Sequence, residues 1–304
     1  MEPPYGLLIP GEQPAKINVT ITVDRNTAQL LNQGREVLDD ILILRLENGR
    51  DYYITIKAAY ARSCFGMSVD ELVMYSDPIR NIPLDPIKRA EKHDPSPANA
   101  LCVPKELWRL IDAIYEKGLR EPDLFVDPGD GEEVKKIREC LVSTLQDTWN
   151  QLRMALLIFR ACSNLPVSLV PFAAGQDTGA PFGNFKSLSY AEALLEFFSS
   201  LSTPIVPPTL FPTLEIDSQN IQSSARRFLE ELPPVHYNVF LYVISFFREA
   251  LVYREMNKLT AAKLARICSN HMAPPSSGMD DSTAAQRRSG MQLIMVHLLE
   301  TNSI

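Results

Sequence analysis

Hydrophobic and polar residues alternate with two different periods along this chain. Between residues 16 and 56, apolar residues recur at every second position, which is the period of half-buried β-strands. From residue 103 onward they recur at i, i+3, i+4 and i+7, which is the period of amphipathic α-helices. The pattern therefore predicts a β-rich N-terminal part followed by an all-helical C-terminal part.

Three N-terminal segments carry the strand pattern. Residues 16–24, KINVTITVD, alternate cleanly, and residues 40–46, DILILRL, are apolar enough for a strand buried on both faces. Asn48-Gly49 then favours a type I′ hairpin turn before the return strand, DYYITI at 51–56. Short strands with turns between them indicate an antiparallel sandwich.

Two neighbouring tyrosines on the return strand, Tyr52 and Tyr53, point to opposite faces. We expect one of them in the core and the other exposed. The exposed ring is either an ordinary surface residue or an aromatic anchor for a protein partner.

The first C-terminal helix is predicted over residues 103–118, with Pro104 at its start, where a missing N–H costs little. Its apolar stripe consists of Leu107, Leu110, Ile111 and Ile114. Ser189 and Glu192 have the spacing of a capping box at the start of a later helix. Further amphipathic helices are predicted at residues 132–145, 190–201, 239–251, 260–269 and 291–298. No strand pattern interrupts them, so we expect a helical bundle.

The patterns divide the chain into three parts. Residues 1–75 form the predicted β domain, 76–100 a linker with five prolines, and 101–304 the helical domain. The net charge of −7 and the absence of a Lys/Arg-rich stripe exclude a nucleic-acid partner. Five widely spaced cysteines indicate free thiols rather than a disulfide framework. No apolar run approaches the roughly 20 residues that a membrane helix needs, so we expect a cytoplasmic protein.

The N-terminal segment resembles the ASH domain of the type II inositol polyphosphate 5-phosphatases, the OCRL-like family. The resemblance rests on LLN-G, DILILRLENG-DY and CFGMS-DEL within residues 22–80. It implies an immunoglobulin-like β-sandwich, here truncated because its first strands would lie before Met1. It also implies binding of Rab GTPases through the strand that carries the tyrosine pair, with Tyr53 as the candidate contact.

The helical part resembles the RhoGAP-like domain that follows the ASH domain in the same phosphatases. Four segments occur in the family's order: VPKELWRLIDAIYEKG with DLF, LSYAEALLEFFSSLSTPIV, LPPVHYNVFLYVISFFREAL and NKLTAAKLARICSNHM. Residues 150–184 look like an insertion relative to the family. The resemblance thus implies a β-sandwich followed by a RhoGAP-like bundle.

At three functional positions this sequence departs from an active RhoGAP domain. The family's catalytic arginine follows a Gly-Ile-Phe motif, and here Val126 stands in its place. A supporting lysine is replaced by Glu196, and a supporting asparagine by Lys263. Because an arginine finger stabilises charge on the transferring phosphoryl group and valine carries no charge or donor, we expect no catalysis.

One alternative is an active GTPase-activating protein that uses Arg160 as an atypical finger, since Leu157-Ile158-Phe159-Arg160 repeats part of the motif. The alternative places Arg160 in the insertion and without the preceding glycine. No phosphatase motif, metal cluster or cofactor motif is visible. Cys268 and His271 stand three residues apart, but a zinc site needs more ligands, and His236 is expected to be a cap or surface group.

The resemblance also implies binding of endocytic adaptor peptides with a Phe/His motif, and of Rho- or Arf-family GTPases. A helix-in-groove mode needs an apolar slot, for which Leu107, Trp108 and Ile111 are the candidates. The alternative for Trp108 is packing against the ASH part or the core edge. We expect an interaction module of a phosphatase, recruited through its partners to endosomal, Golgi or plasma membranes.

Overall fold

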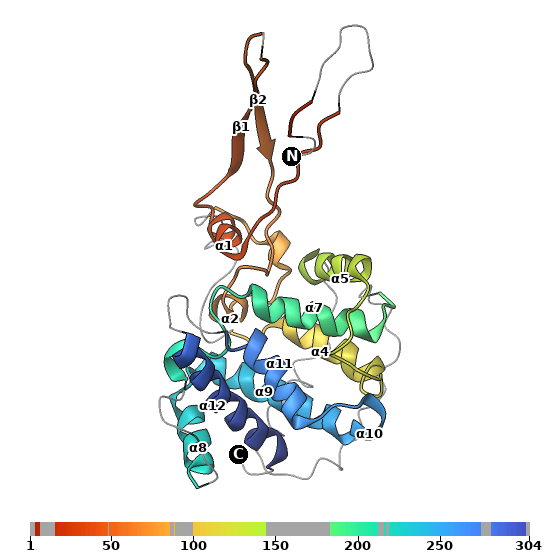
Figure 1. Ribbon diagram of the computed structural model, residues 1–304, viewed down its shortest axis with the longest axis vertical. Coiled ribbons are helices and arrows are strands. Elements are labelled where there is room, and N and C mark those ends of the chain that lie inside the picture. Colours follow the sequence, from red (N-terminus) through yellow and green to blue (C-terminus); the bar gives the residue numbers. More distant parts are fainter. Residues whose placement is uncertain are drawn as a thin grey trace.

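The computed structural model describes residues 4–6, 16–47, 49–85, 88, 100–143, 183–211, 216, 219–274 and 281–301. A β-hairpin projects from a body of packed helices, as Figure 1 shows. The predicted fold class, a β part followed by an all-helical part, is confirmed. Most of the predicted insertion, and with it Arg160, lies outside the described residues.

The hairpin consists of β1 (Leu38–Leu44) and β2 (Tyr52–Ala58), paired antiparallel with Leu38 opposite Ala58 and Leu44 opposite Tyr52. The predicted pair of strands is thus confirmed. In the described part of the chain they form a two-stranded sheet, which is not packed against a second sheet as in a sandwich.

Two expectations about the N-terminal part are wrong, and one helix was not predicted. Residues 16–24 form only an isolated bridge at Asn18 rather than a strand. β1 is not buried on both faces, because no second layer covers it among the described residues. The pattern also missed helix α1 (Arg25–Gln33), which Asp24 caps by accepting from the Thr27 N–H at 2.7 Å.

Residues 61–82 connect the hairpin to the helices and pack into the helical core. They include α2 (Val69–Leu72) and the short 3₁₀ helix η1 (Ile79–Asn81). Their buried side chains share one cluster with those of the helical part; they are Cys64, Phe65, Met67, Val69, Leu72, Ile79 and Ile82. Ile79 and Ile82, in the first part of the predicted linker, therefore belong to the helical core.

The helical part runs through one long series of elements. They are α4 (Lys105–Lys117), α5 (Gly131–Ser143), α7 (Ser187–Ser200), η4 (Pro208–Leu210), α8 (Ile221–Glu231), α9 (Pro234–Val252), α10 (Arg254–Asn257), α11 (Ala261–His271) and α12 (Asp281–Glu300). α7 packs against α4 and α5, and α12 packs against α8, α9 and α11. The first five predicted helices are confirmed, with ends shifted by at most five residues. α12 begins ten residues before the predicted start at 291, and α8 and α10 were not predicted.

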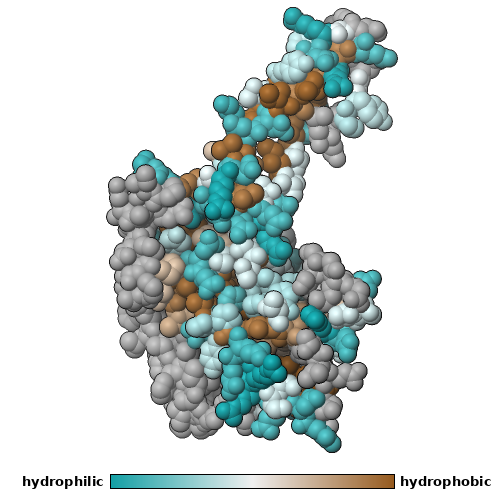
Figure 2. Space-filling view, turned by 90° about the vertical axis from the view of Figure 1, so that its left-hand side faces the viewer, coloured by the Kyte–Doolittle hydropathy of each residue, from teal (hydrophilic) through white to brown (hydrophobic). Residues whose placement is uncertain are grey.

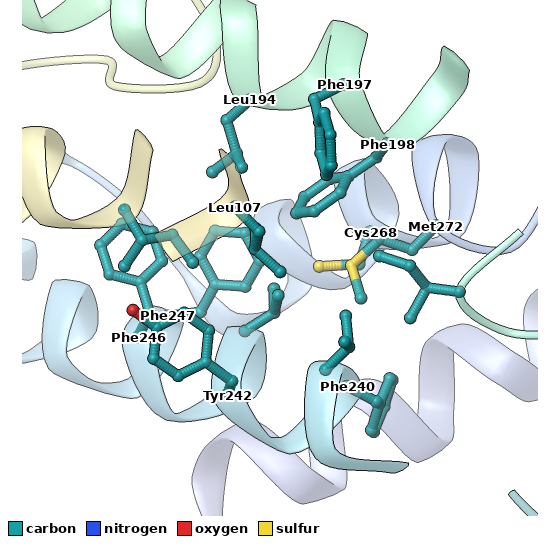
Figure 3. Close-up of a cluster of buried hydrophobic side chains, with 14 of the residues drawn as sticks. Leu107, Leu194, Phe197, Phe198, Phe240, Tyr242, Phe246, Phe247, Cys268 and Met272 are labelled. Carbon is teal, nitrogen blue, oxygen red and sulfur yellow. The ribbon is translucent and has the colours of Figure 1, made fainter. Parts of the chain in front are cut away.

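The core lies where α4, α7, α9 and α11 meet. Figure 3 shows their aromatic and aliphatic side chains pointing toward one another, including Leu107, Phe197, Phe247 and Met272. α9 is buried on most of its circumference, as expected of a central helix. No helix in the described ranges is long and apolar enough to cross a membrane.

Candidate functional site

The loop after α4 contains Val126, and its backbone has an unusual conformation. We call residues 119–130 the finger loop. Asp123 and Phe125 have φ of 51° and 68°, in the left-handed region that residues other than glycine seldom adopt. Phe125 is buried, and its ring meets Phe246 and Phe247 edge-on at centroid distances of 6.1 and 5.4 Å. This packing holds the loop in its strained conformation.

Asn257 joins the finger loop to two helices. Its backbone carbonyl accepts from the Asp123 N–H at 3.0 Å. Its side-chain amide donates to the carbonyls of Leu119 and Ala250, both at 2.8 Å, and its side-chain oxygen accepts from the Leu259 N–H at 3.0 Å. Because Asn257 is fully buried, these bonds are shielded from water. The start of the finger loop, the end of α9 and the start of α11 therefore form one unit.

The far end of the finger loop is held by α7. The Gly129 N–H donates to Glu192 Oε2 at 2.5 Å, and the Asp130 N–H donates to Ser189 Oγ at 3.1 Å. A Cβ on Gly129 would lie 2.5 Å from the Cα of Ser189, so only glycine permits this approach. The capping box predicted from Ser189 and Glu192 is wrong, because both lie inside α7 and bind the finger loop instead.

Two carboxylates complete this contact. Glu133 accepts from the Ser189 hydroxyl at 2.7 Å and from the Lys186 N–H at 3.0 Å, and these bonds lower the pKa of Glu133. Asp130 accepts from the N–H groups of Glu133 and Glu132 at the start of α5, which lowers the pKa of Asp130. The finger loop is thus fixed at both ends.

Between these fixed ends, Val126 points outward. Its side chain is 46% exposed, while the preceding Leu124 and Phe125 are buried. The Val126 N–H donates to the Asp123 carbonyl at 2.8 Å, which closes a tight turn. The loop therefore presents position 126 to solvent, but the group presented is an isopropyl side chain.

Lys263 lies in the first turn of α11, next to the segment that Asn257 joins to the finger loop. Its N–H donates to the capping hydroxyl of Thr260 at 3.2 Å. Its Nζ donates to the carbonyl of Lys258 at 3.1 Å. The lysine side chain thus lies along its own loop and satisfies a carbonyl of that loop.

Glu196 lies on α7, one turn after Glu192, and forms an ion pair with Arg138 of α5 at 3.1 Å. The Arg138 guanidinium lies over the Phe65 ring at 4.3 Å from its centroid. Both charged groups line a cleft of about 260 Å³ whose other wall is formed by α1. Glu196 is therefore directed toward the N-terminal part of the chain.

Tyr53 is 68% exposed near the start of β2. Tyr52 is also exposed, so the prediction that one of the two rings enters a core is wrong. The Arg50 guanidinium lies over the Tyr52 ring at 5.1 Å from its centroid. In the described residues no second sheet lies over the hairpin, which leaves both rings in solvent.

The predicted peptide groove on α4 is not open. Leu107 and Ile111 lie in the core, and Trp108 is only 6% exposed. α4 packs against both α5 and α7, and the Lys105 ammonium donates to the Tyr75 carbonyl of the connecting segment at 3.0 Å. Helix contacts on more than one side bury positions outside the narrow apolar stripe. We therefore correct the groove prediction: these three side chains are core residues.

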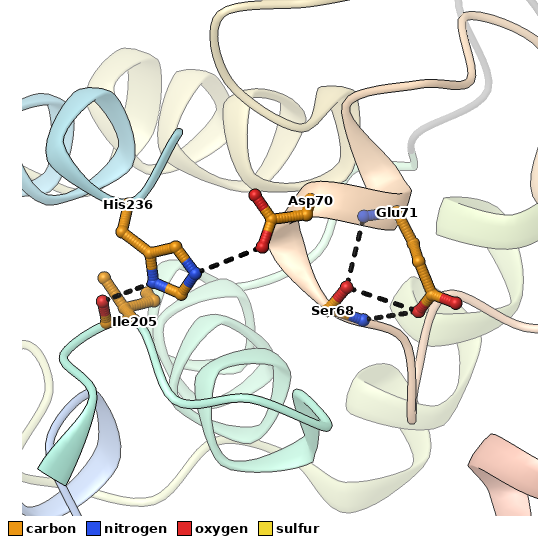
Figure 4. A network of polar contacts seen from close by, with 5 residues as sticks. All are labelled: Ser68, Asp70, Glu71, Ile205 and His236. Carbon is orange, nitrogen blue, oxygen red and sulfur yellow. Dashed lines mark hydrogen bonds and ion pairs between the residues drawn. The ribbon is translucent and has the colours of Figure 1, made fainter. Parts of the chain in front are cut away.

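His236 is a buried connection that the sequence pattern misassigned. Figure 4 shows its ring between the Ile205 carbonyl, 2.8 Å from Nδ1, and the Asp70 carboxylate, 3.3 Å from Nε2. Asp70 belongs to α2, which begins with a capping box formed by Ser68 and Glu71. The Ser-x-x-Glu spacing was visible in the sequence, whereas the contact with His236 requires the fold.

Cys268 and His271, the remaining candidate residues, do not form a catalytic or metal-binding site in the described part of the chain. Cys268 is buried in the core, which raises its pKa, and burial lowers the pKa of His271. His271 Nδ1 lies 2.7 Å from Ser199 Oγ. Within the described ranges, no three His, Cys, Asp or Glu side chains gather as metal ligands.

Fold and loop together define a helical domain that presents a fixed loop and is preceded by a β module. The RhoGAP domain model matches residues 104–277, more than half of the 304 residues, and the chain belongs to this family. The model for the ASH domain of OCRL-like inositol polyphosphate 5-phosphatases matches residues 1–60. Neither matching model is a phosphatase domain.

A curated relative, the type II inositol 1,4,5-trisphosphate 5-phosphatase of Mus musculus, is 29% identical over 272 residues. The match covers 87% of this chain but only 24% of the relative. Two solved structures, human Rho GTPase activating protein 15 and the BH domain from GRAF, the GTPase regulator associated with focal adhesion kinase, each show 13% identity and a TM-score of 0.46. The match to Rho GTPase activating protein 15 covers 66% of this chain and 85% of that protein's chain. The match to the BH domain covers 65% of this chain and 90% of that domain's chain. Likenesses this distant add nothing to the assignment.

Proposed function

We propose that this chain is an interaction module that binds small GTPases without accelerating GTP hydrolysis. The observation that supports it is Val126, an exposed apolar side chain on a loop fixed at both ends. The arginine that an active RhoGAP domain inserts contributes on the order of 10³–10⁵ in rate. Val126 supplies neither charge nor hydrogen-bond donor, so this contribution is lost.

The two supporting positions agree with this proposal. Glu196 carries the charge opposite to that of the family's lysine and is neutralised by Arg138 rather than directed at the finger loop. Lys263 donates to the Lys258 carbonyl of its own loop. Neither group replaces the missing guanidinium, because neither lies on the turn that presents Val126.

The experiment is a single-turnover GTP hydrolysis assay with a Rho-family GTPase, together with binding measured on the same sample. We expect binding of the GTP-loaded form and an unchanged hydrolysis rate. Val126→Ala should leave both unchanged, and Val126→Arg should raise the rate, because the loop already presents this position. Acceleration on the order of 10³ by the wild type would contradict the proposal. If the wild type accelerated hydrolysis and the Arg160→Ala variant did not, Arg160 would be the atypical arginine finger instead.

The ASH part is proposed to bind active Rab GTPases through β2. Tyr53 supports this proposal, since a broad exposed ring on a strand is a typical interface anchor. We expect Tyr53→Ala to weaken binding of a GTP-loaded Rab at least about tenfold, the size of a hot-spot residue. Val37→Ala, an equally exposed apolar residue beside β1, is the control and should not change binding.

Adaptor peptides with a Phe/His motif are proposed as the third partner class, at a site other than the buried face of α4, because Leu107, Trp108 and Ile111 lie in the core. We expect saturable binding of such a helix to the purified chain, measured by calorimetry, with Trp108→Phe leaving the affinity nearly unchanged. Absence of binding by the folded chain would contradict the proposal.

The printed name of the mouse relative supports a setting for the module. We propose that it belongs to the phosphoinositide phosphatase system and that bound GTPases recruit it to endosomal, Golgi or plasma membranes. Imaging of the tagged chain, with and without Tyr53→Ala, tests this: recruitment independent of every GTPase contact would contradict it.

A further inference from the structure

The ring of His236 joins three segments that lie far apart in the sequence. His236 belongs to the first turn of α9, and its side chain is only 3% exposed. Nδ1 lies 2.8 Å from the Ile205 carbonyl, in the loop after α7, and Nε2 lies 3.3 Å from Asp70 Oδ2 of α2 (Figure 4). The buried ring therefore has one polar contact on each side.

Both of these contacts are made with oxygens that accept hydrogen bonds. The Ile205 carbonyl has no proton to give, so Nδ1 has to be the donor in that contact. The side chain of Asp70 is 59% exposed, and a hydrated aspartate is ionised at neutral pH, so its carboxylate also accepts. A neutral imidazole has one N–H, whereas an imidazolium has two. Only the imidazolium donates in both contacts.

Among the described residues, the two segments that contact the ring bring no second charge to it. Glu71, next to Asp70 on α2, turns toward the capping box and accepts from the Ser68 N–H at 2.9 Å (Figure 4). Residues 201–207, which include Ile205, contain no ionisable side chain. Asp70 is therefore the charged group that faces His236 from these two segments.

The helices around α9 use their charged groups elsewhere. At the end of α8, Glu230 and Glu231 are paired with arginines of the same helix. α12 binds the guanidinium of Arg248, near the other end of α9, and α10 begins at Arg254, beyond that end. In the described part of the chain, the ring of His236 has no further hydrogen bond or ion pair.

We infer that His236 is an imidazolium when α2 lies against α9, and that the attachment of α2 weakens when the ring loses its second proton. Figure 2 shows the N-terminal part projecting from the helical body, so its attachment depends on the segments that run between the two. Residues 61–82 are such a segment, and α2 is part of it. The inference is independent of the proposed GTPase binding.

The sign of the pH dependence follows from counting protons. A histidine free in water holds its second proton only below about pH 6.5. Above that pH, the attached state binds one proton more than the open state, because the Asp70 carboxylate retains it. Proton linkage therefore favours attachment at lower pH and weakens it as pH rises. Carboxylates such as that of Glu133, whose pKa is lowered, give the opposite sign.

Nitrogen NMR of the full chain tests the protonation state. At neutral pH we expect both ring nitrogens of His236 to carry a proton. His271 is the internal control, because the Ser199 hydroxyl, 2.7 Å from its Nδ1, can donate to a neutral ring, and burial lowers the pKa of His271. We expect His271 to show one protonated and one bare nitrogen. A bare Nε2 on His236 at neutral pH would overturn the inference.

Hydrogen exchange tests the attachment. The N–H groups of Leu72 and Val73 bind the carbonyls of Ser68 and Val69, so their protection reports the opening of α2. After correction for the intrinsic exchange rate, opening should rise about fivefold from about pH 6 to about pH 8, the size of a partly exposed ion pair. The amide of Leu264 in α11 is the control and should show no such rise.

Asp70→Asn is the matched variant, and its exposed position makes it compatible with folding. An asparagine amide can donate to a bare Nε2, so the contact is kept with a neutral ring. We expect the opening of α2 to become independent of pH in this variant, whereas Asp70→Ala should raise it at both pH values. A wild type whose opening does not change with pH, or an Asp70→Asn variant that changes as much as the wild type, would overturn the inference.

Discussion

The hairpin and the helical body bury their apolar residues to very different extents. β1 and β2 expose Ile41, Ile43 and Ile54, whereas α9 places most of its side chains in the core. The hairpin is held by strand pairing with little packing, and the helical body is held by packing. The connecting segment 61–82 joins the second group, although it lies between strands and helices in sequence. The stability of a segment therefore depends on whether it packs into the shared core, and not on its position in the sequence.

The largest test of this comparison is a matched pair of truncations. Phe247 is fully buried and its ring lies 5.4 Å from Phe125, so Phe247→Ala should reduce the free energy of unfolding by about 3–5 kcal/mol. Ile41→Ala in the hairpin should cost at most about 0.5 kcal/mol, because this side chain is 57% exposed. Denaturant unfolding followed by circular dichroism measures both. Equal losses would contradict the contrast.

The next test concerns the connecting segment. Leu72 of α2 is fully buried in the cluster shared with the helices, so Leu72→Ala should destabilise the helical transition by about 2–5 kcal/mol. Leu30→Ala on α1, with a partly exposed side chain, is the control. If residues up to 75 fold as a separate unit, Leu72→Ala will instead leave the helical transition unchanged. The predicted domain boundaries depend on that outcome.

A smaller effect is expected at the polar connection of the finger loop. Asn257→Ala leaves the carbonyls of Leu119 and Ala250 and the N–H of Leu259 without their partner, which should cost about 1–3 kcal/mol. Asn257→Asp keeps the acceptor but loses both donated bonds, so it should not restore stability. Thermal unfolding measures the loss. A neutral Asn257→Ala would show that the finger loop is held by Phe125 alone.

The smallest effect is a pH dependence. The pKa values of Asp130 and Glu133 are lowered from ordinary values of 3.8 and 4.5 by hydrogen bonds to their charged forms. Lowered acid pKa values give stability that is present above the ordinary pKa and is lost as pH falls through the folded-state pKa. Stability should therefore decrease as pH falls below about 4.5. Glu133→Gln should flatten this slope, and Glu132→Gln, whose side chain pairs with Lys135 in the described part of the chain, should not.

The sequence predicted most of the helical body because its 3.6-residue period is long and regular, but it missed α8 and the first half of α12. It missed α1, whose buried residues are only Ala28, Leu31 and Asn32, too few to produce a stripe. The signals that would have found it are Asp24 at its start and Gly34, with φ 71°, at its end. The order of motifs predicted that Val126 stands in place of the catalytic arginine. Its exposure could not be predicted, because it depends on how Phe125 packs in the core.

The groove prediction failed for a different physical reason. Periodicity shows which face of α4 is most apolar, but it does not show how many neighbours surround the helix. Trp108 lies beside the stripe and is still buried, because α4 contacts other elements on several sides. Likewise, nothing in the local sequence indicates that His236 meets Asp70, which lies 166 positions earlier. Such contacts depend on tertiary packing alone.

The position of Asn257 has a consequence for the dynamics of the surface around Val126. The amide hydrogens of Asp123 and Leu259 are bound to the same buried residue, one to its backbone carbonyl and one to its side-chain oxygen. A local opening that frees one amide therefore removes the support of the other. These two sites, far apart in sequence, should exchange their hydrogens with solvent at a common rate. A partner that occupies the finger loop should then slow exchange at the start of α11 without touching it.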